Sequence, residues 1–348
     1  MTIAWDLYLA TGDETLLDRH FAAMTRWVDF VHQHNPDLLW LNQLGMNWGD
    51  WMSAGSPVTP NDLAATAYFA HSADLTGKAA AILGRRFDAE KYHELYKGIC
   101  RAFVRRWVKA DGTIYGGAQG SYALALQFEL LSPDLIAPAM HHLTDAIDRN
   151  HGHLTTGYLS TRALVQALSR FGGHGVASRM INQVTRPSWG YMVDTIGTTF
   201  WESFNAYIKG QVVTLSLCHW PWSSIGEWFW RYVAGISPDE QRAGWREFHV
   251  EPRPTPEVRW CEAEYQSPAG RIDLNWRAKG KELVVQLGVP LNATALVKLP
   301  INHNSHLIVN GRKLSANQAT KMVHTRGSAV ELSLAGGHYT ISVDGLTG

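Results

Sequence analysis

Apolar residues recur at intervals of three and four positions from the start of the chain to about residue 235. Between residues 15 and 34 the apolar set includes Leu17, Phe21, Met24, Val28 and Val31. This spacing places the side chains on one face, so the segment predicts a long amphipathic α-helix. The same periodicity predicts further helices over residues 62–83, 88–108, 121–131, 135–149, 161–171, 176–184 and 224–234.

Beyond Pro238 the apolar positions alternate with polar ones. Valine, leucine and isoleucine dominate short runs that are separated by turn residues such as Asn310-Gly311. A period of two is that of a half-buried strand, and Asn-Gly is a common hairpin turn. The pattern predicts an antiparallel β-sandwich with strands over residues 247–251, 258–266, 271–276, 282–289, 293–299, 307–309, 329–334 and 338–343.

The two patterns divide the chain into two predicted domains. Residues 1–237 form a helical domain and residues 238–348 a C-terminal β-sandwich, and the pattern changes between Ile236 and Arg246. We expect the sequence Ser237-Pro238-Asp239 to end the last helix, because these residues favour turns. The predicted fold class is therefore mainly α with a β domain.

Charge and composition restrict the partners of the chain. Its 31 basic residues balance 31 acidic ones, so it lacks the positive field that attracts nucleic acid or an anionic membrane. Every apolar run is shorter than the ~18 residues that a membrane span needs. The N-terminal stretch contains Asp6, Asp13 and Glu14 instead of the basic start and apolar core of a secretion signal. Because the three cysteines are also scattered, we expect a reduced, cytoplasmic protein.

Tryptophan is abundant, with 15 residues in the chain. Several lie next to acids, amides or glycines in predicted loops, among them Trp48, Trp51 and Trp189. Aromatic rings stack on the apolar faces of pyranose rings, so loop tryptophans predict the rim of a saccharide site. The alternative for each of them is ordinary core packing.

The carboxylate of Glu202 lies in an aromatic part of the chain. Trp201 and Phe204 flank it and His219 follows a short loop later. Partial desolvation by the rings raises the basicity of a carboxylate, which can then take a proton from a water molecule. This combination predicts glycoside chemistry with Glu202 as the catalytic group. The alternatives are that Glu202 caps a helix or pairs with an arginine, and that His219 is a core residue.

Other chemistries have little support in the sequence. The 16 histidines include no His-x-x-x-His pair with a nearby acid, which argues against a catalytic zinc ion. No Gly-x-Ser-x-Gly motif follows a predicted strand, and no glycine-rich phosphate loop occurs. We therefore expect neither a metal nor a cofactor.

A series of short motifs resembles the inverting α-L-rhamnosidases of bacteria and fungi, which are six-hairpin glycosidases. Each motif is weak alone, but their order and spacing together are specific. The resemblance implies an (α/α)6 toroid followed by a β-sandwich. The motifs are WDLYLATGD at residues 5–13, GDW at 49–51, HLTTGY at 153–158, PSWGYM at 187–192, TTFWE at 198–202, SLCH at 216–219 and GEWFWRYVAGI at 226–236.

The resemblance also implies roles for individual residues. Glu202 corresponds to the general base that deprotonates the water attacking the anomeric carbon. Asp50 matches an acid that holds the sugar hydroxyls, although an aspartate after glycine is often only a turn former. His219 matches a histidine that binds the sugar or orients the water, and Trp48, Trp51 and Trp189 are candidate stacking walls. The implied partner is a rhamnose-containing saccharide or glycoside.

The second half of an inverting mechanism is not evident in this sequence. An inverting glycosidase uses two carboxyl groups roughly 6.5–9.5 Å apart, one as acid and one as base. The family's acidic motif lies before the position that corresponds to Met1, and no counterpart of it occurs in this chain. The predicted helices are also fewer than the twelve of a complete toroid. We therefore expect a toroid incomplete at its N-terminus, covered by a second copy of the chain or by a missing N-terminal segment, and impaired activity.

Two other functions stay open at this point. One is a different (α/α)6 glycoside hydrolase, acting for example on glucuronides or trehalose-like sugars. The other is a non-catalytic carbohydrate-binding remnant, in which the aromatic rim persists without turnover.

Overall fold

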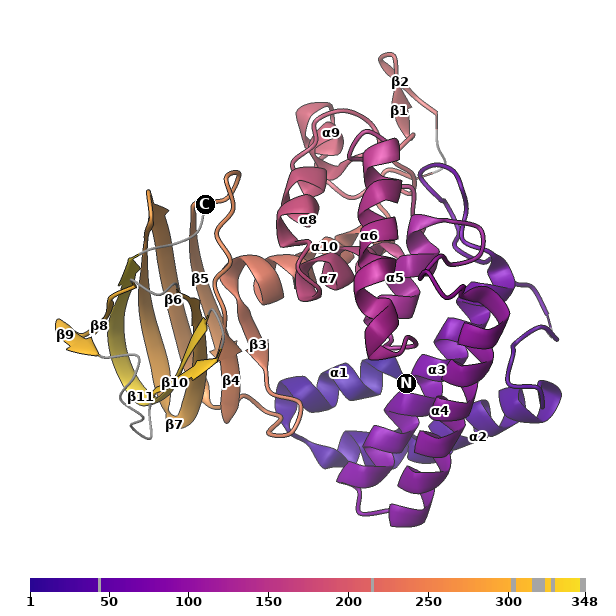
Figure 1. The fold of residues 1–348 in the computed structure, drawn as a ribbon, viewed down its shortest axis with the longest axis horizontal. Coiled ribbons are helices and arrows are strands. Elements are labelled where there is room, and N and C mark those ends of the chain that lie inside the picture. The colour runs from indigo at the N-terminus through magenta and orange to yellow at the C-terminus, as the bar shows by residue number, and fades with distance from the viewer. Residues whose placement is uncertain (43–44, 214–215, 302–304, 315–322, 327–328, 345–348) are drawn as a thin grey trace. The chain divides into compact units, whose positions relative to one another are not determined.

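The computed structural model describes residues 1–42, 45–213, 216–301, 305–314, 323–326 and 329–344. By the contacts between its residues the chain divides into two compact units (Figure 1). Unit 1 comprises residues 1–2 and 17–226, and unit 2 comprises residues 3–16 and 227–348. The predicted fold class, mainly α with a β domain, is confirmed. The domain boundary between residues 237 and 238 stays a prediction, and so does the incompleteness of the toroid at its N-terminus.

Unit 1 is built from helices that pack in pairs. Helix α3 packs against α4, α5 against both α6 and α7, and α7 against α8. Helix α5 is buried on almost all sides, which is why its sequence shows no polar face, whereas α7 keeps a polar side that includes Arg162 and Arg170. The α-helices that lie wholly or partly in unit 1, apart from α1, are α2 (Glu14–His34), α3 (Asn61–Ile82), α4 (Arg86–Trp107), α5 (Gln119–Gln127), α6 (Pro133–Arg149), α7 (Thr161–Arg170), α8 (His174–Ile181), α9 (Trp189–Asp194) and α10 (Ile225–Trp228).

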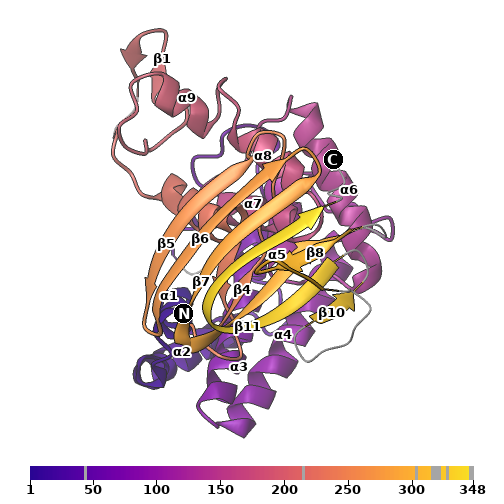
Figure 2. The same cartoon turned by 90° about the vertical axis from the view of Figure 1, so that its left-hand side faces the viewer.

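Unit 2 contains most of the first helix, α1 (Thr2–Thr11), and, among the described residues, one sheet of nine strands. The arrangement of these strands as a sandwich stays a prediction. The N–H of Gly244 donates to the carbonyl of Leu9 in α1 at 3.0 Å. Strands β5, β6, β7 and β11 lie side by side (Figure 2). The strands are β3 (Ile236–Pro238), β4 (Glu247–Val250), β5 (Trp260–Ser267), β6 (Gly270–Lys279), β7 (Glu282–Pro300), β8 (Leu307–Val309), β9 (Arg312–Leu314), β10 (Val323–Arg326) and β11 (Ala329–Asp344).

The two longest strands correct the prediction for this region. Residues 282–289 and 293–299 were each predicted as a strand, but they belong to the single strand β7. Likewise 329–334 and 338–343 belong to β11, which contains a bulge between Ala335 and Gly337. A bulge lets a strand bend without ending, so Gly336-Gly337 marks a bend here and not a turn. One pairing, β4 with β7, is parallel in an otherwise antiparallel arrangement.

The segment before the sheet of unit 2 also differs from the prediction. Residues 224–234 were predicted as one α-helix, but a 3-10 turn (Pro221–Ser224), the short α10 and a π-helix (Phe229–Ala234) follow one another. Gly235 then adopts a left-handed conformation that ends the helix, and residues 236–238 form β3. The sequence Ser237-Pro238-Asp239 therefore does not end the helix. The periodicity also missed α9 and the hairpin of β1 (Tyr207–Ile208) and β2 (Gln211–Val212).

Trp276 is a large side chain in the core of unit 2. It is fully buried on β6, and its indole Nε1 donates to the carbonyl of Val233 at 2.9 Å. Trp260 on β5 has the opposite environment, because it is 58% exposed. Across the described ranges, none of the helices combines the length and the apolar character that crossing a bilayer requires.

We predict that Trp276→Phe lowers the free energy of unfolding by about 1–3 kcal/mol. The substitution leaves the buried carbonyl of Val233 without its donor and opens a small cavity. Urea denaturation followed by circular dichroism measures the change. The matched control is Trp260→Phe, for which we expect less than about 0.5 kcal/mol because the ring is exposed. Equal losses in both variants would contradict this assignment of the core.

Candidate active site

Two backbone hydrogen bonds place Glu202 and His219 on neighbouring segments. The N–H of Glu202 donates to the carbonyl of Ser216 at 3.0 Å, and the N–H of His219 donates to the carbonyl of Phe200 at 2.7 Å. Residues 200–202 and 216–219 therefore lie side by side although 17 positions separate the two predicted site residues. This pairing puts the two predicted site residues on adjacent backbone segments.

The backbone carbonyl of Glu202 is also held. It accepts the phenol O–H of Tyr158 at 2.5 Å and the indole N–H of Trp222 at 3.2 Å. Both hydrogen-bonding groups of the Glu202 backbone are thus occupied, and three different parts of unit 1 supply the partners. The position of the residue is consequently well defined.

The carboxylate of Glu202 is half-buried. Among the described residues it has neither a hydrogen bond nor an ion pair, so an arginine does not neutralise it there. The neighbours Trp201 and Phe204 are each 1% exposed and form the core behind it. Trp201 therefore supports the backbone from inside. A carboxylate that lacks an intramolecular donor keeps its lone pairs available for an external water molecule.

Asp50 has the opposite environment, because its carboxylate is 3% exposed and fully engaged. One oxygen accepts the N–H groups of Leu159 and Ser160, both at 3.0 Å. The other accepts the Thr59 hydroxyl at 2.8 Å, the Gly157 N–H at 3.1 Å and the Ser160 hydroxyl. Asp50 thus fastens the loop of residues 157–160, and this geometry argues against the predicted contact with sugar hydroxyls.

Tyr158 connects the loop that Asp50 holds to the other site residues. Its ring lies 5.8 Å from the ring of His219 and 5.1 Å from that of Trp222. Burial, and second the negative charge of Glu202, raise the pKa of the Tyr158 phenol to about 12. The phenol therefore stays protonated and remains a donor at the pH of the cell.

The predicted tryptophans separate into two environments. Trp48 and Trp51 are 59% and 44% exposed, and their rings meet edge to face with centroids 4.9 Å apart. They are free to stack on a ligand. Trp189 is buried, and its indole N–H donates to the carbonyl of Trp222 at 3.1 Å. That burial argues against Trp189 as a stacking wall, because its ring belongs to the core.

Sequence reasoning did not predict that Tyr158 and Trp222 hold the backbone of Glu202. Tyr158 ends the HLTTGY motif, and Trp222 follows the SLCH motif by three positions. Both residues were within recognised motifs or next to them. What singles them out is that both donate to the same carbonyl, which spacing along the chain does not reveal.

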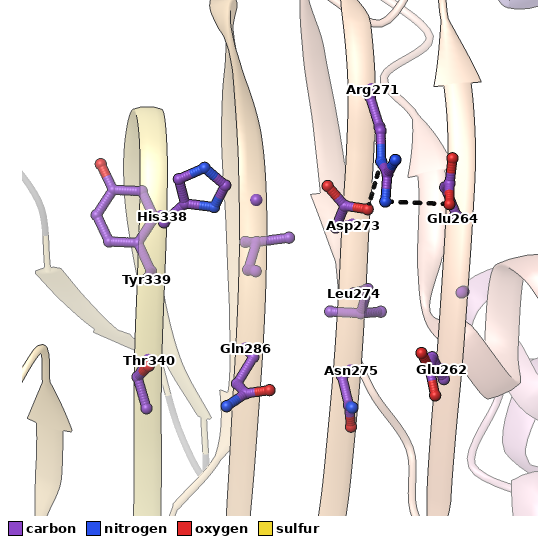
Figure 3. Close-up of a pocket in the computed structure, with 13 residues that line it drawn as sticks. Glu262, Glu264, Arg271, Asp273, Leu274, Asn275, Gln286, His338, Tyr339 and Thr340 are labelled. Carbon is purple, nitrogen blue, oxygen red and sulfur yellow. Dashed lines mark hydrogen bonds and ion pairs between the residues drawn. The ribbon is translucent and has the colours of Figure 1, made fainter.

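Neither a metal site nor the hollow on unit 2 adds to this site. Within the part of the chain that the structure describes, no three histidine, cysteine, aspartate or glutamate side chains lie close enough to hold a metal ion. A hollow of about 560 Å³ lies over β5, β6, β7 and β11, and Glu202 and His219 do not line it. Figure 3 shows Glu262, Asn275, Gln286 and Thr340 in a row across these strands. Such polar rows are usual on the solvent face of an antiparallel sheet.

Paired helices followed by a β-sheet domain, with a carboxylate at Glu202 that has no hydrogen-bond partner among the described residues, are the arrangement expected of six-hairpin glycosidases. Residues 1–233 match the model of the bacterial alpha-L-rhamnosidase six-hairpin glycosidase domain, and residues 235–313 match that of the bacterial alpha-L-rhamnosidase C-terminal domain. The chain belongs to the bacterial α-L-rhamnosidase family. The resemblance seen in the short motifs is thereby confirmed.

Individual relatives agree with the family models. An alpha-L-rhamnosidase of Streptomyces avermitilis is 36% identical over 307 residues, which cover 87% of this chain and 29% of the relative. The solved structure of a Streptomyces avermitilis alpha-L-rhamnosidase complexed with L-rhamnose matches 99% of this chain and 32% of its own, with 33% identity and a TM-score of 0.88. The Dictyoglomus thermophilum alpha-L-rhamnosidase structure matches 99% and 39%, with 26% identity and a TM-score of 0.89. The chain thus spans about a third of the length of these relatives.

We predict that Gly157→Ala destabilises unit 1 by about 1–3 kcal/mol, because a Cβ at this position would press on the carbonyl oxygens of Asp50 and Trp51. The loop that carries Tyr158 would then have to move. The unfolding midpoint in urea and the rate of limited proteolysis near residue 157 measure the effect. Gly226→Ala is the control, since its Cβ would meet no atom within 4 Å. An undisturbed Gly157→Ala variant would show that the two segments are not tightly packed.

Proposed function

We propose that this chain takes part in the hydrolysis of terminal α-L-rhamnosides by inversion, with a rhamnose-containing saccharide or glycoside as the substrate. The observation that carries the proposal is the environment of Glu202. Its backbone is fixed by hydrogen bonds on both sides, while its carboxylate is free of partners among the described residues. The names of the relatives support the choice of sugar.

In the proposed mechanism Glu202 is the general base. It accepts a proton from the water molecule that attacks the anomeric carbon as the bond to the leaving group breaks. His219, half-buried on the neighbouring segment, hydrogen-bonds the sugar or orients this water. The exposed rings of Trp48 and Trp51 bind an apolar face of the sugar. No metal or cofactor enters the scheme.

The second half of this mechanism is the general acid, which protonates the leaving group. A leaving group that departs as an alkoxide needs a proton, whereas an activated phenolate hardly does. The family's acidic motif has no counterpart in this sequence, and we propose that the chain alone is impaired on natural substrates.

We predict that Glu202→Gln lowers kcat on an activated aryl α-L-rhamnoside by at least about 10²-fold. The amide keeps the shape of the side chain but does not accept the proton from water. Initial-rate kinetics on the purified chain measure the loss. Glu227→Gln is the control, because Glu227 is held by Arg231 at 2.7 Å, and we expect its kcat to stay within about twofold. A Glu202→Gln variant with full activity would refute the proposed base.

A comparison of two leaving groups tests the acid side. If the acid is lacking, the chain hydrolyses an aryl rhamnoside with a good leaving group and fails on rhamnose-containing disaccharides. The ratio of kcat/KM for the two substrates is the measurement. Equal efficiency on both would show that a general acid is present.

The exposed pair of Trp48 and Trp51 favours one further candidate, a carbohydrate-binding remnant. Rhamnose binding by calorimetry that is lost in Trp51→Ala, without hydrolysis that depends on Glu202, would support it. A panel of aryl glycosides that includes glucuronides separates the rhamnosidase and the carbohydrate-binding remnant from another (α/α)6 hydrolase.

We also keep as proposals a cytoplasmic location and an association with a second copy of the chain or with a preceding segment.

A further inference from the structure

We propose that Asp50 positions Glu202 through Tyr158: the buried carboxylate fixes the loop of residues 157–160, and the phenol of Tyr158 in that loop fixes the backbone of Glu202. We call this the Asp50–Tyr158 link. It rests on the proposed function for the role of Glu202 as the base. The link makes Tyr158 a positioning residue and gives Asp50 a task other than binding sugar.

The first step of the link is the attachment of the loop to Asp50. Three backbone N–H groups and one hydroxyl of residues 157–160 donate to this single carboxylate, and the Thr59 hydroxyl is the fifth donor. The N–H of Tyr158 itself donates to the carbonyl of Trp51 at 2.9 Å. Gly157 allows this approach because it has no Cβ. The backbone of Tyr158 is therefore held on both sides.

The number of hydrogen bonds that the Asp50 carboxylate can accept shows why it cannot both hold the loop and bind a sugar. Two carboxylate oxygens offer about four lone-pair sites, and here they accept five hydrogen bonds from the chain. A sugar hydroxyl would have to displace one of these donors and leave it unsatisfied in a buried place, at a cost of about 1–3 kcal/mol. Asp50 is also only 3% exposed.

The second step runs from Tyr158 to Glu202. The phenol donates to the backbone carbonyl of Glu202 and not to its carboxylate. A donor on the carboxylate would stabilise the charged form and weaken the base. A donor on the carbonyl fixes the backbone of Glu202 and leaves the lone pairs of its carboxylate free of that donor. Trp222 donates to the same carbonyl, so the phenol and the indole together hold the base.

The ionisation of the phenol fits this role. Its pKa of about 12 reflects burial and the nearby charge of Glu202, so the donor persists throughout the pH range in which a carboxylate base works. The same proximity provides a signal that needs no catalysis. When Glu202 gains or loses its proton, the ring of Tyr158 experiences a different field.

The test is ¹⁹F NMR on the full chain labelled with 3-fluorotyrosine, with the Tyr158 resonance assigned as the one that disappears in Tyr158→Phe. We expect this resonance to shift with pH as Glu202 titrates, and the step to vanish in Glu202→Gln. In Asp50→Asn the step should be lost or strongly reduced, because an amide cannot accept all five donors. A step that persists unchanged in Asp50→Asn overturns the link.

Asp50→Asn could fail to fold, so a milder variant is part of the design. Ser160→Ala removes one of the five hydrogen bonds and keeps the backbone donors. We expect it to reduce the amplitude of the pH-dependent shift of Tyr158 in the same direction. No change in the shift of Tyr158 in a folded Ser160→Ala variant would contradict the proposal even where Asp50→Asn does not fold.

Kinetics on an activated aryl rhamnoside separate positioning from general stability. Because a displacement of about 1 Å can cost 10²-fold in rate, we expect Tyr158→Phe to lower kcat by about 10- to 100-fold with KM changed less than about twofold. Tyr96→Phe is the matched control, since the Tyr96 phenol also donates to backbone carbonyls, those of Phe128 and Glu129. A raised KM at unchanged kcat in Asp50→Asn would restore its role as a sugar ligand.

The two proposals can fail separately. If the chain hydrolyses no rhamnoside, the NMR titration still decides whether Asp50 couples Tyr158 to Glu202. If hydrolysis depends on Glu202 but Tyr158→Phe behaves like Tyr96→Phe, the link is wrong while the proposed function stands.

Discussion

The buried carboxylate of Asp50 is the interaction on which the arrangement of the site depends. A charge that leaves water loses several kcal/mol of solvation unless hydrogen bonds replace the water. Asp50 receives five, four of them from residues 157–160, which follow more than a hundred positions later. The cost of burial is therefore met only when the two segments come together. Burial of the Asp50 carboxylate and packing of the loop of residues 157–160 therefore depend on each other.

The segments that carry Glu202 and His219 show how loop residues can be held as firmly as helical ones. Neither Glu202 nor His219 lies on a helix or strand, yet the backbone of each is paired with the opposite segment. Behind them Trp201, Phe204 and Trp222 are almost completely buried and fill the space that backbone motion would need. A base must be fixed in position but free in its protonation. The structure achieves both by directing its donors to the backbone and leaving the carboxylate unpartnered among the described residues.

Periodicity predicted most of the fold because it depends on which face is buried. It found the long helices and the inner faces of the strands. It failed where proline or glycine residues were taken as turns although the strand continues. Pro290 and Gly336-Gly337 read as turns, but β7 and β11 run through them because neighbouring strands continue to pair on either side. The site was predictable in part. The aromatic surroundings of Glu202 are visible in the sequence, whereas the contacts that join Asp50 to Tyr158 depend on a loop whose partners are distant along the chain.

The tryptophans show why composition alone overestimates a sugar site. In the sequence Trp189 and Trp51 look alike, since each stands in a loop beside glycine or aspartate. In the structure one indole is buried with its N–H bound to a carbonyl, and the other is 44% exposed beside Trp48. Only a ring with a free face can stack on a ligand, so exposure, and not abundance, limits the rim to a few residues. The buried indoles serve the site differently, because Trp222 uses its N–H to hold the backbone of the base in place.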